Sequence, residues 1–386
     1  MNNEAYKKHV GIGIPVLLLG GTERQTLALA SVLLSGGYKV TVWCYYESDA
    51  SMISELTKIG AEVLLLGLNR AEGLLSLLDK LKNLWKGMKP DIIHVQYIAP
   101  GLIPVIAAKL AGIKTIFATV HQPGRVYGWK EKLFLRTAAR LCTAFFCNSK
   151  SVEESWFGDS EIFDPNRDYK KRKHFTIYNG VDIEHIEQVV NSTDRQSLKG
   201  SLGISDRPVI GVVGRLRWEK GQDILIEAMP EVVRAIPSAM LLVVGDGPDR
   251  MSLEQRAKSL ELENNILWLG QKSPEEVYQL CSIMDVVVVP SRFEGFGLTA
   301  AEAMSASRPV IGSRLDGLTE VVANDVTGLL VSSGDSAALG RALIDLLSDK
   351  GKAKEMGEKG RMRVGEFFSV ERFQNSVLAA YKALDT

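Results

Sequence analysis

Two glutamates eight positions apart, Glu294 and Glu302, flank a glycine-containing turn. The turn follows residues 286–290, an apolar run typical of a buried parallel strand, and residues 298–304 after it are mostly good helix formers. Free N–H groups and the positive dipole end of such a helix attract an anion. A carboxylate at Glu302, among small apolar neighbours, needs hydrogen-bond donors, and a sugar diol has two. A salt-bridged helical glutamate behind an ordinary turn would give the same pattern.

Two cations, Arg215 and Lys220, follow a predicted strand at residues 209–213 and are flanked by glycines. Such a pair at the carboxyl end of a strand suits a diphosphate, because arginine can bind it through two hydrogen bonds and lysine acts as a point charge. Each would otherwise be half of a surface ion pair. Predicted strands at residues 240–244 and 265–269 end in similar glycine turns. Four such turns in series indicate a crevice for a nucleotide.

The elements that position these residues are predicted from the periodicity of the apolar side chains. Short apolar runs alternate with amphipathic segments in the first half of the chain, and the second half shows the same alternation. The order predicts an α/β protein with parallel, doubly wound sheets. Predicted strands in the first half are 10–14, 39–43, 62–66, 92–95, 115–119, 144–147 and 174–177. Predicted helices are 22–35, 71–85, 101–111, 222–235, 251–260 and 274–281, and the polar stretch 182–207 is predicted to connect two domains.

Size and charge set the broad class of the protein. A chain of 386 residues is longer than a domain with a single hydrophobic core usually is, so two domains are expected. Residues 1–180 hold 23 Lys and Arg against 16 Asp and Glu, whereas residues 181–386 hold 23 against 30. A basic first half suits an acidic acceptor or an anionic membrane surface, and attraction between domains would account for it equally well. The basic residues are scattered and no recognition helix is evident, which argues against nucleic-acid binding.

The expected compartment is the cytoplasm. The four cysteines show no CxxC or zinc spacing, which favours reduced, buried thiols. The apolar start of the chain is interrupted by Pro15 and lacks the cleavage site of a signal peptide. No stretch reaches the ~20 apolar residues that span a bilayer. The protein could therefore lie at most on the inner face of the cell membrane.

Motifs in a fixed order resemble the retaining glycosyltransferases of family 4, also called glycosyl transferases group 1. The similarity covers nearly the whole chain and is most specific in the carboxyl half. The motifs there are Gly214-Arg215-Leu216 with Lys220-Gly221, Val244-Gly245-Asp246-Gly247-Pro248, the pair Glu294 and Glu302, Arg308-Pro309-Val310-Ile311 and Thr327-Gly328-Leu329-Leu330. The amino half matches more loosely through Gly20-Gly21-Thr22-Glu23-Arg24, Pro90-Asp91-Ile92-Ile93-His94 and Asn179-Gly180-Val181-Asp182.

The resemblance implies the GT-B fold, in which two doubly wound Rossmann-like domains face each other across a cleft. The domain at 1–185 would bind the acceptor and the domain at 186–365 the nucleotide-sugar donor. A C-terminal helix at 366–386 would cross back to the first domain. The implied activity is retaining transfer of a hexosyl or N-acetylhexosaminyl group from a nucleoside-diphosphate sugar, with a UDP-sugar favoured. The acceptor would be a saccharide or a lipid-linked molecule in cell-surface polysaccharide or glycolipid biosynthesis.

Residue roles follow from the same resemblance. Arg215 and Lys220 would contact the donor diphosphate, whose negative charge grows as it leaves. Glu294 and His121 would contact the transferred sugar, and these four are the expected catalytic residues. Glu302 would bind the ribose hydroxyls. The full set of expected donor-binding residues is Gly20, Gly21, Gly214, Asp246, Gly247, Leu269, Gly270, Gly297, Leu298, Thr299 and Glu302.

No metal ion and no other cofactor is expected, because no DxD pair flanks a strand and two cations would do the work of a metal. A nucleotide-sugar epimerase of the same architecture and a non-catalytic donor-binding subunit are alternatives. Two-carboxylate hydrolysis is a competing use of Glu294 and Glu302. The chain departs from the family pattern at Asp316-Gly317-Leu318, where relatives more often carry paired glycines, and this leaves the sugar preference open.

The acceptor site is expected near Arg125 and Tyr127, where a basic, aromatic-edged segment begins. That segment continues through Trp129, Lys130, Lys132, Arg136 and Arg140, and a second basic run occupies residues 167–173. These residues would hold a lipid-linked diphosphate acceptor or the anionic membrane that supplies it. A solvated helix face and a basic loop would give the same sequence.

Overall fold

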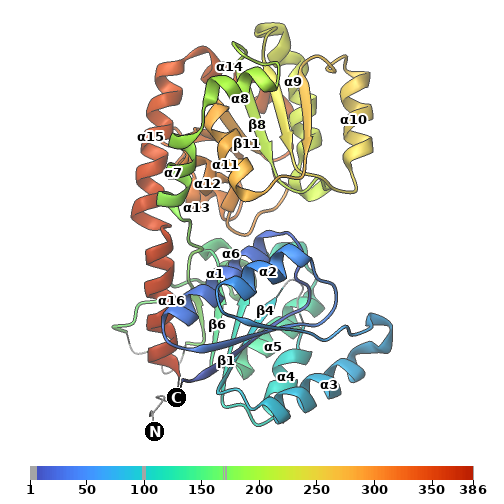
Figure 1. The fold of residues 1–386 in the computed structure, drawn as a ribbon, viewed down its shortest axis with the longest axis vertical. Coiled ribbons are helices and arrows are strands. Elements are labelled where there is room, and N and C mark those ends of the chain that lie inside the picture. The colour runs from blue at the N-terminus through green and yellow to red at the C-terminus, as the bar shows by residue number, and fades with distance from the viewer. Residues whose placement is uncertain (1–6, 98–100, 168, 170–171, 386) are drawn as a thin grey trace. The chain divides into compact units, whose positions relative to one another are not determined.

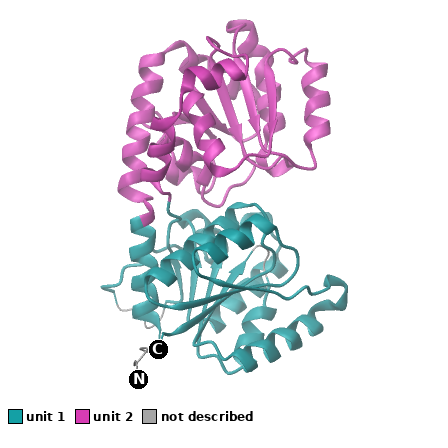
Figure 2. Cartoon of the chain, in the orientation of Figure 1, with its two compact units in different colours: residues 1–180, 371–386 teal, residues 181–370 magenta. Residues whose placement is uncertain are grey.

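The computed structural model describes residues 7–97, 101–167, 169 and 172–385, and the chain divides into two compact units. Unit 1 comprises residues 1–180 and 371–386, and unit 2 comprises residues 181–370 (Figure 2). Each unit is a parallel sheet with helices packed against it (Figure 1). No described helix combines the length and the apolar character needed to cross a membrane.

The sheet of unit 1 has seven parallel strands in the order β3-β2-β1-β4-β5-β6-β7. They are β1 (His9–Ile14), β2 (Lys39–Cys44), β3 (Glu62–Leu65), β4 (Ile92–Tyr97), β5 (Thr115–Val120), β6 (Ala144–Cys147) and β7 (His174–Thr176). All seven predicted strands are therefore confirmed, with ends shifted by at most two residues. The strand order reverses between β1 and β4, and α/β proteins bind ligands at the carboxyl ends of strands beside such a switch point.

Hydrophobic cores cover both faces of this sheet. Successive strand residues point to opposite faces, so Ile92 belongs to one core and its neighbour Ile93 to the other. Helices α1 (Gly21–Ser35), α2 (Ala50–Lys58) and α16 (Val370–Leu384) contribute to the first core. Helices α3 (Gly73–Met88), α4 (Ile103–Leu110), α5 (Trp129–Leu141) and α6 (Lys150–Phe157) contribute to the second.

The C-terminal helix α16 packs in unit 1, as predicted. Its buried Phe373 and Val377 join the core beside α1. The Tyr381 ring lies 4.7 Å from the ring of Phe117, and the Tyr381 hydroxyl is 2.7 Å from Nδ1 of His94. The last part of the chain therefore completes a core that the first part begins.

The sheet of unit 2 has six parallel strands in the order β10-β9-β8-β11-β12-β13. They are β8 (Val209–Val213), β9 (Met240–Val244), β10 (Ile266–Gly270), β11 (Val286–Val289), β12 (Val310–Ser313) and β13 (Gly328–Val331). The four valines of β11 are at most 6% exposed, because a central parallel strand is covered on both faces. The switch point of this sheet lies between β8 and β11.

Helices of unit 2 form two packed groups. Helices α9 (Gln222–Ala235), α10 (Arg250–Ser259) and α14 (Ser336–Ser348) are neighbours. Helices α7 (Ile183–Ser192), α11 (Pro274–Ile283), α12 (Leu298–Ser305) and α15 (Lys350–Phe367) form the other group. Two short helices, α8 (Arg195–Ser201) and α13 (Leu318–Val321), complete the unit.

The prediction that residues 182–207 form a polar connection was wrong. They contain α7 and α8, and α7 packs on α11 within unit 2. Ile186 and Val190, four positions apart, are the buried residues of α7. Only one face of this helix is apolar, and the many charged residues around it hide that face in the sequence.

All four cysteines are buried and none forms a disulfide, as predicted. Burial raises the pKa of the Cys142 and Cys281 thiols to about 12. Both thiols are therefore protonated and unreactive near neutral pH.

Candidate active site

The loops that leave β8, β9 and β10 are joined to one another by backbone hydrogen bonds. Gly214 donates to the carbonyl of Val244 at 2.9 Å, and Gly245 donates to the carbonyl of Gly270 at 2.7 Å. The φ angles of Gly214 and Gly245 are 146° and 136°, values that side chains rarely allow. A Cβ atom on Gly245 would lie 2.0 Å from the carbonyl oxygen of Gly214. These glycines let the backbones approach closely at the carboxyl edge of the sheet.

An ion pair spans the switch point between β8 and β11. Lys220 Nζ lies 2.7 Å from Glu294 Oε2, and the Ser291 hydroxyl is 3.3 Å from the same oxygen. The side chains of Lys220 and Glu294 are 35% and 17% exposed, so a ligand can reach both. Gly221 has a φ of 69°, and a Cβ atom there would lie 2.0 Å from the carbonyl oxygen of Pro290. The glycine beside Lys220 thus allows the two loops to touch.

A second charged contact holds these loops together. The Arg292 guanidinium donates to both carboxylate oxygens of Asp223, at 2.8 and 2.6 Å, and to the Trp218 carbonyl at 2.6 Å. It also lies 4.8 Å from the centre of the Trp218 ring. Burial opposes ionisation of Asp223, but the Arg292 hydrogen bonds outweigh it and lower the pKa of that carboxyl. Arg292 therefore fixes the backbone that carries Lys220.

Helix α12 begins directly after this ion pair. Gly297, with a φ of 101°, is its N-cap, and no side chain caps the first turn that contains Leu298 and Thr299. The positive end of α12 therefore faces the same edge as Lys220. Glu302, one turn further along, is partly exposed, and Tyr278 donates to its Oε1 at 3.4 Å.

The remaining predicted donor residues of unit 2 lie at the same edge. Arg215 is exposed, and Gln222 donates to its backbone carbonyl at 3.1 Å. The Asp246 carboxylate accepts from the backbone N–H of Gly247 at 2.7 Å and from Arg250 at 3.2 Å. Leu269 and Gly270 end the adjoining strand β10.

The predicted departure from the family pattern has a structural counterpart. Asp316 adopts a φ of 39°, which non-glycine residues seldom take. The next residue, Gly317, donates to the Glu294 carbonyl at 3.4 Å, and a Cβ atom on it would lie 2.4 Å from the carbonyl oxygen of Gly295. Space therefore requires a glycine at position 317, and backbone conformation would favour one at 316.

In unit 1, His121 follows β5 and is 8% exposed. Its Nε2 lies 2.7 Å from Gln96 Oε1, and an amide oxygen only accepts, so Nε2 donates and Nδ1 is left as an acceptor. Burial lowers the pKa of His121 to about 4, so the ring is neutral near pH 7. Asn148 donates to the His121 carbonyl at 3.2 Å and fixes the backbone there.

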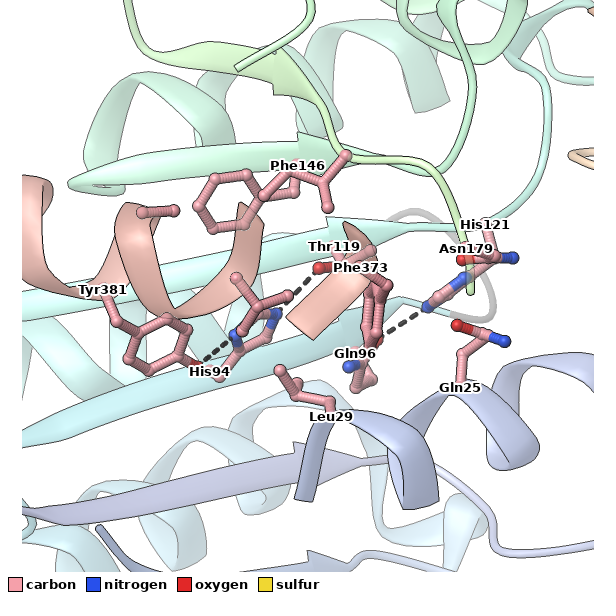
Figure 3. A pocket seen from close by; sticks show the side chains of 13 residues that line it. Gln25, Leu29, His94, Gln96, Thr119, His121, Phe146, Asn179, Phe373 and Tyr381 are labelled. Carbon is pink, nitrogen blue, oxygen red and sulfur yellow. Dashed lines mark hydrogen bonds between the residues drawn. The ribbon is translucent and has the colours of Figure 1, made fainter. Parts of the chain in front are cut away.

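A small pocket of about 30 Å³ adjoins His121 (Figure 3). Gln25, Gln96 and Asn179 lie at the His121 end, and His94 lies at the other end, bonded to Thr119 and Tyr381. The Oε1 atom of Gln25 is buried without a hydrogen-bond partner in the described part of the chain. The pocket has room for about one or two water molecules rather than for a sugar ring.

The predicted phosphate-facing glycines begin helix α1. Gly20 is the N-cap of α1 in an extended conformation, and no side chain caps the helix. The helix begins at Gly21, one residue before the predicted start at Thr22. An N-terminus without a side-chain cap suits an anion, and anion binding by Gly20 and Gly21 stays a prediction.

The predicted acceptor residues have partners inside unit 1. Tyr127 donates to Gln122 and stacks on Trp156 with 5.4 Å between ring centres. Arg125 is exposed in a single 3-10 turn, Gly124–Val126. In the second basic run, Arg167 pairs with Glu161, and Arg172 pairs with Glu153 and Asp159. Asp168, Lys170 and Lys171 of that run lie outside the described residues.

Two family models match successive parts of the chain. The model described as Glycosyltransferase Family 4 matches residues 19–185, and the model described as Glycosyl transferases group 1 matches residues 194–363. The chain belongs to glycosyltransferase family 4. The predicted resemblance is therefore confirmed.

Curated relatives agree on the class of enzyme. The chain is 29% identical over 310 residues to N-acetyl-alpha-D-glucosaminyl L-malate synthase of Bacillus anthracis. The matched region covers 80% of this chain and 78% of that protein. It is 30% identical over 268 residues to a GDP-mannose-dependent alpha-(1-6)-phosphatidylinositol monomannoside mannosyltransferase of Mycolicibacterium smegmatis, covering 66% of each. The protein is a glycosyltransferase.

Solved structures show the fold. Anabaena HepE in complex with UDP and glucose has a TM-score of 0.78 and 21% identity over 96% of this chain and 98% of that chain. A glycosyltransferase from Rickettsia africae has a TM-score of 0.80 and 22% identity, covering 98% and 99%. Two parallel, doubly wound sheets with these neighbours identify the GT-B fold of family 4, as predicted.

Sequence reasoning missed the residues that support the family 4 motifs. Asp223, Gln222 and Gln96 hold Arg292, the Arg215 backbone and His121, respectively. Each is an ordinary polar residue without a motif of its own. Only its partner across the fold gives it a role.

Proposed function

We propose that this enzyme is a retaining glycosyltransferase that moves a sugar from a nucleoside-diphosphate sugar to a saccharide or lipid-linked acceptor in cell-surface polysaccharide or glycolipid assembly. The observation that carries the proposal is the edge of unit 2 at the β8/β11 switch point. Exposed Arg215, reachable Lys220 and the uncapped start of α12 gather there. A leaving nucleoside diphosphate needs this combination.

Departure of the diphosphate is the step that these groups stabilise. Negative charge on its oxygens grows as the bond to the sugar breaks, so fixed positive groups bind the transition state more tightly than the ground state. Arg215 and Lys220 would contact the diphosphate, and the backbone of Gly297, Leu298 and Thr299 the distal phosphate. The interloop hydrogen bonds of Gly214 and the Arg292–Asp223 pair preorganise the loops that carry these groups.

No metal ion is part of the proposed mechanism. The two cations and the positive end of α12 would neutralise the leaving group in place of a divalent cation. Activity that persists in the presence of EDTA would support this point, and activity restored only by added Mg²⁺ or Mn²⁺ would contradict it.

Sugar contacts are assigned to Glu294 and His121. Lys220 and Ser291 occupy Oε2 of Glu294, which leaves Oε1 to accept from a sugar hydroxyl. Neutral His121, whose Nε2 is held by Gln96, has Nδ1 as an acceptor for another hydroxyl. Glu302 would bind the ribose hydroxyls, and Asp246, Gly247, Leu269 and Gly270 would line the base.

Retention follows if the acceptor hydroxyl attacks from the face that the diphosphate leaves, through an oxocarbenium-like state. A donor phosphate oxygen would accept the proton of the acceptor. Two relatives are named for alpha-linked sugars, the configuration that retention gives from an alpha-linked donor. The anomeric coupling in the NMR spectrum of the product tests this, and a beta product from an alpha donor would contradict it.

The donor is tested by screening. UDP-, GDP- and ADP-sugars are compared for thermal stabilisation of the protein and for slow hydrolysis without acceptor. UDP-sugars come first because the similar HepE structure contains UDP, although a relative is named for GDP-mannose. A 100-fold excess of donor over its Kd stabilises the fold by about 2.7 kcal/mol, which is easily measured as a shift in melting temperature. Absence of any shift or hydrolysis with all three classes would contradict the proposal.

The same assay separates the two alternatives. An epimerase would convert one nucleotide sugar into another without acceptor, which chromatography of the nucleotide sugars detects. A donor-binding subunit would show the thermal shift without hydrolysis or transfer. Transfer to an added saccharide or lipid-linked acceptor distinguishes the proposed enzyme from both.

Contact with an anionic membrane is also proposed, through the exposed face of α5. Trp129, Leu133 and Phe134 are 72%, 51% and 49% exposed. Lys130 and Arg136 are exposed beside them on the same helix. An exposed apolar face edged by cations fits the surface of an anionic bilayer, where Trp and Phe enter the interface and Lys and Arg meet the headgroups.

A further inference from the structure

A basic pocket lies at the opposite edge of the unit 2 sheet from the donor loops. It has a volume of about 580 Å³, which is in the range of small-molecule sites. Its walls include residues just before three strands, namely Pro208 before β8, Asp285 before β11 and Pro309 before β12. Because the strands are parallel, their amino ends share one edge of the sheet and their carboxyl ends the other. The pocket is therefore separate from the donor site.

The pocket is basic, although the half of the chain that forms it is acidic overall. Residues 181–386 hold seven more acidic than basic residues, 30 against 23. The pocket is lined by six basic side chains and three carboxylates: Arg195, Lys199, Arg207, Arg308, Lys350 and Lys354 with Asp206, Asp285 and Glu358. Positive charge is concentrated here in the acidic half of the chain.

Some of these charges have structural partners. Arg207 donates to the backbone carbonyls of Ser238 and Asn264 and anchors the loop before β8. Lys354 pairs with Glu358 at 3.8 Å, and Asp285 accepts from the Val209 backbone N–H at 2.7 Å. These groups need no ligand.

The other cations of the pocket lack a carboxylate partner in the described part of the chain. Within the described part of the chain, Arg195, Arg308 and Lys350 form no ion pair with any carboxylate. Arg308 is held in place, because its guanidinium donates to the carbonyls of Ala306 and Met284 at 3.1 and 3.0 Å. Burial, and then the neighbouring Arg195, lower the pKa of Arg308. Asp285, also in the lining, offsets part of this effect, and a bound anion would stabilise the two neighbouring guanidinium groups further.

We propose that this pocket, formed by Arg195, Lys199, Arg308 and Lys350, is a second binding site, for a small anion that carries two or more phosphate groups. Planar guanidinium groups bind phosphate through paired hydrogen bonds, and Arg308 is already fixed by the backbone. The volume exceeds that needed by a single phosphate and accommodates a polyphosphate or a phosphorylated sugar. The Lys199 ammonium donates to the Arg207 carbonyl at 3.4 Å and can turn toward the ligand.

The experiment uses tripolyphosphate as the probe, measured by calorimetry at low salt. The probe would also bind the donor site, so all proteins carry Arg215→Ala and Lys220→Ala. The test variant adds Arg195→Gln and Lys350→Gln, two exposed positions where loss of the fold is not expected. The control adds Arg234→Gln and Lys258→Gln, which are exposed in the same unit but do not line the pocket.

Binding is expected in the background protein and in the control, and about tenfold weaker in the test variant, since each charge-assisted contact to phosphate is strong. Equal affinity in all three proteins would overturn the proposal, as would absence of binding in the background protein. Equal weakening in test and control would show a diffuse charge effect and would also overturn it. Because the donor-site cations are absent, the result does not depend on the proposed transferase function.

Discussion

The carboxyl edges of the two sheets share a strand order around the switch point but differ in chemistry. The edge of unit 2 carries charged side chains, with Lys220 bonded to Glu294 and Arg292 bonded to Asp223. Among the described residues, none that lines the pocket beside His121 in unit 1 is Asp, Glu, Lys or Arg. The edge of unit 2 therefore presents fixed charge, whereas the His121 pocket of unit 1 presents neutral hydrogen-bonding groups.

This difference has a physical reason. A diphosphate carries charge in both its bound and departing forms, so its site profits from cations held on preorganised loops. Sugar hydroxyls carry no charge, and in the proposed function a buried neutral acceptor such as His121 would bind them without the cost of burying an ion. Burial lowers the pKa of His121 to about 4, and the imidazole ring is therefore neutral near pH 7.

Among tests of the difference between the two edges, Lys220→Ala is expected to have the largest effect, on catalysis. Loss of a cation that acts on the leaving diphosphate should cost on the order of 2–4 kcal/mol in transition-state stabilisation, about 30- to 1000-fold in kcat/KM. Steady-state kinetics with the donor identified by the screen measures it. Lys258→Ala, an exposed lysine on α10, is the matched control and should keep full activity. Unchanged turnover in Lys220→Ala would remove the role assigned to this edge.

A smaller effect is expected from the backbone at the two edges. Gly221→Ala places a Cβ atom 2.0 Å from the Pro290 carbonyl at a φ of 69°, so about 1–3 kcal/mol of stability should be lost. Gly20→Ala in unit 1 has a φ of −159° and meets only the end of the Glu23 side chain, so it should cost less than about 1 kcal/mol. Urea unfolding at pH 7 compares the two. A Gly20→Ala cost equal to that of Gly221→Ala would contradict the contrast.

The buried neutral histidines of unit 1 should make the free energy of unfolding depend on pH. Burial lowers the pKa of His121 to about 4 and that of His94 to about 3, below the ordinary value of 6.5 in the unfolded chain. The unfolded state therefore takes up protons first, so stability is full above pH 6.5 and falls as the pH drops toward 4. Between pH 6.5 and 5.5 each histidine should contribute about 1 kcal/mol of this loss.

His121→Gln should remove one histidine's share of that loss, because glutamine does not titrate. The measurement is urea unfolding of both proteins at pH 6.5 and 5.5. If His121→Gln and wild type lose the same stability, His121 is not held neutral by burial.

The smallest effect concerns the basic character of unit 1. Lys130→Gln should weaken binding to vesicles containing phosphatidylserine by up to about 1 kcal/mol, or about fivefold, since one cation near an anionic surface contributes that much. Co-sedimentation at low and high salt measures it. Lys258→Gln in unit 2 should have no effect. Absence of vesicle binding by the wild type at low salt would remove the membrane proposal.

Much of the fold was predictable because parallel strands buried on both faces leave an unmistakable apolar run. The valines of β11 and all seven strands of unit 1 were located in this way. Residues 182–207 were not, because α7 buries only Ile186 and Val190 among charged neighbours. A narrow apolar face is a weak signal in a sequence, and its helix is stabilised by packing on α11.

By itself, the sequence determined which residue types stand at the carboxyl ends of the strands: glycines where backbones meet, cations at Arg215 and Lys220, and glutamates eight positions apart. Strand order, and with it the contact between residues 220 and 294, was decided only by the tertiary structure. A side chain acquires its partner from the neighbouring strand of the sheet, and local sequence carries no record of which strand that is. For the same reason, only the folded chain shows that Gln96 holds His121 and that the cations before β8 and β12 line one pocket.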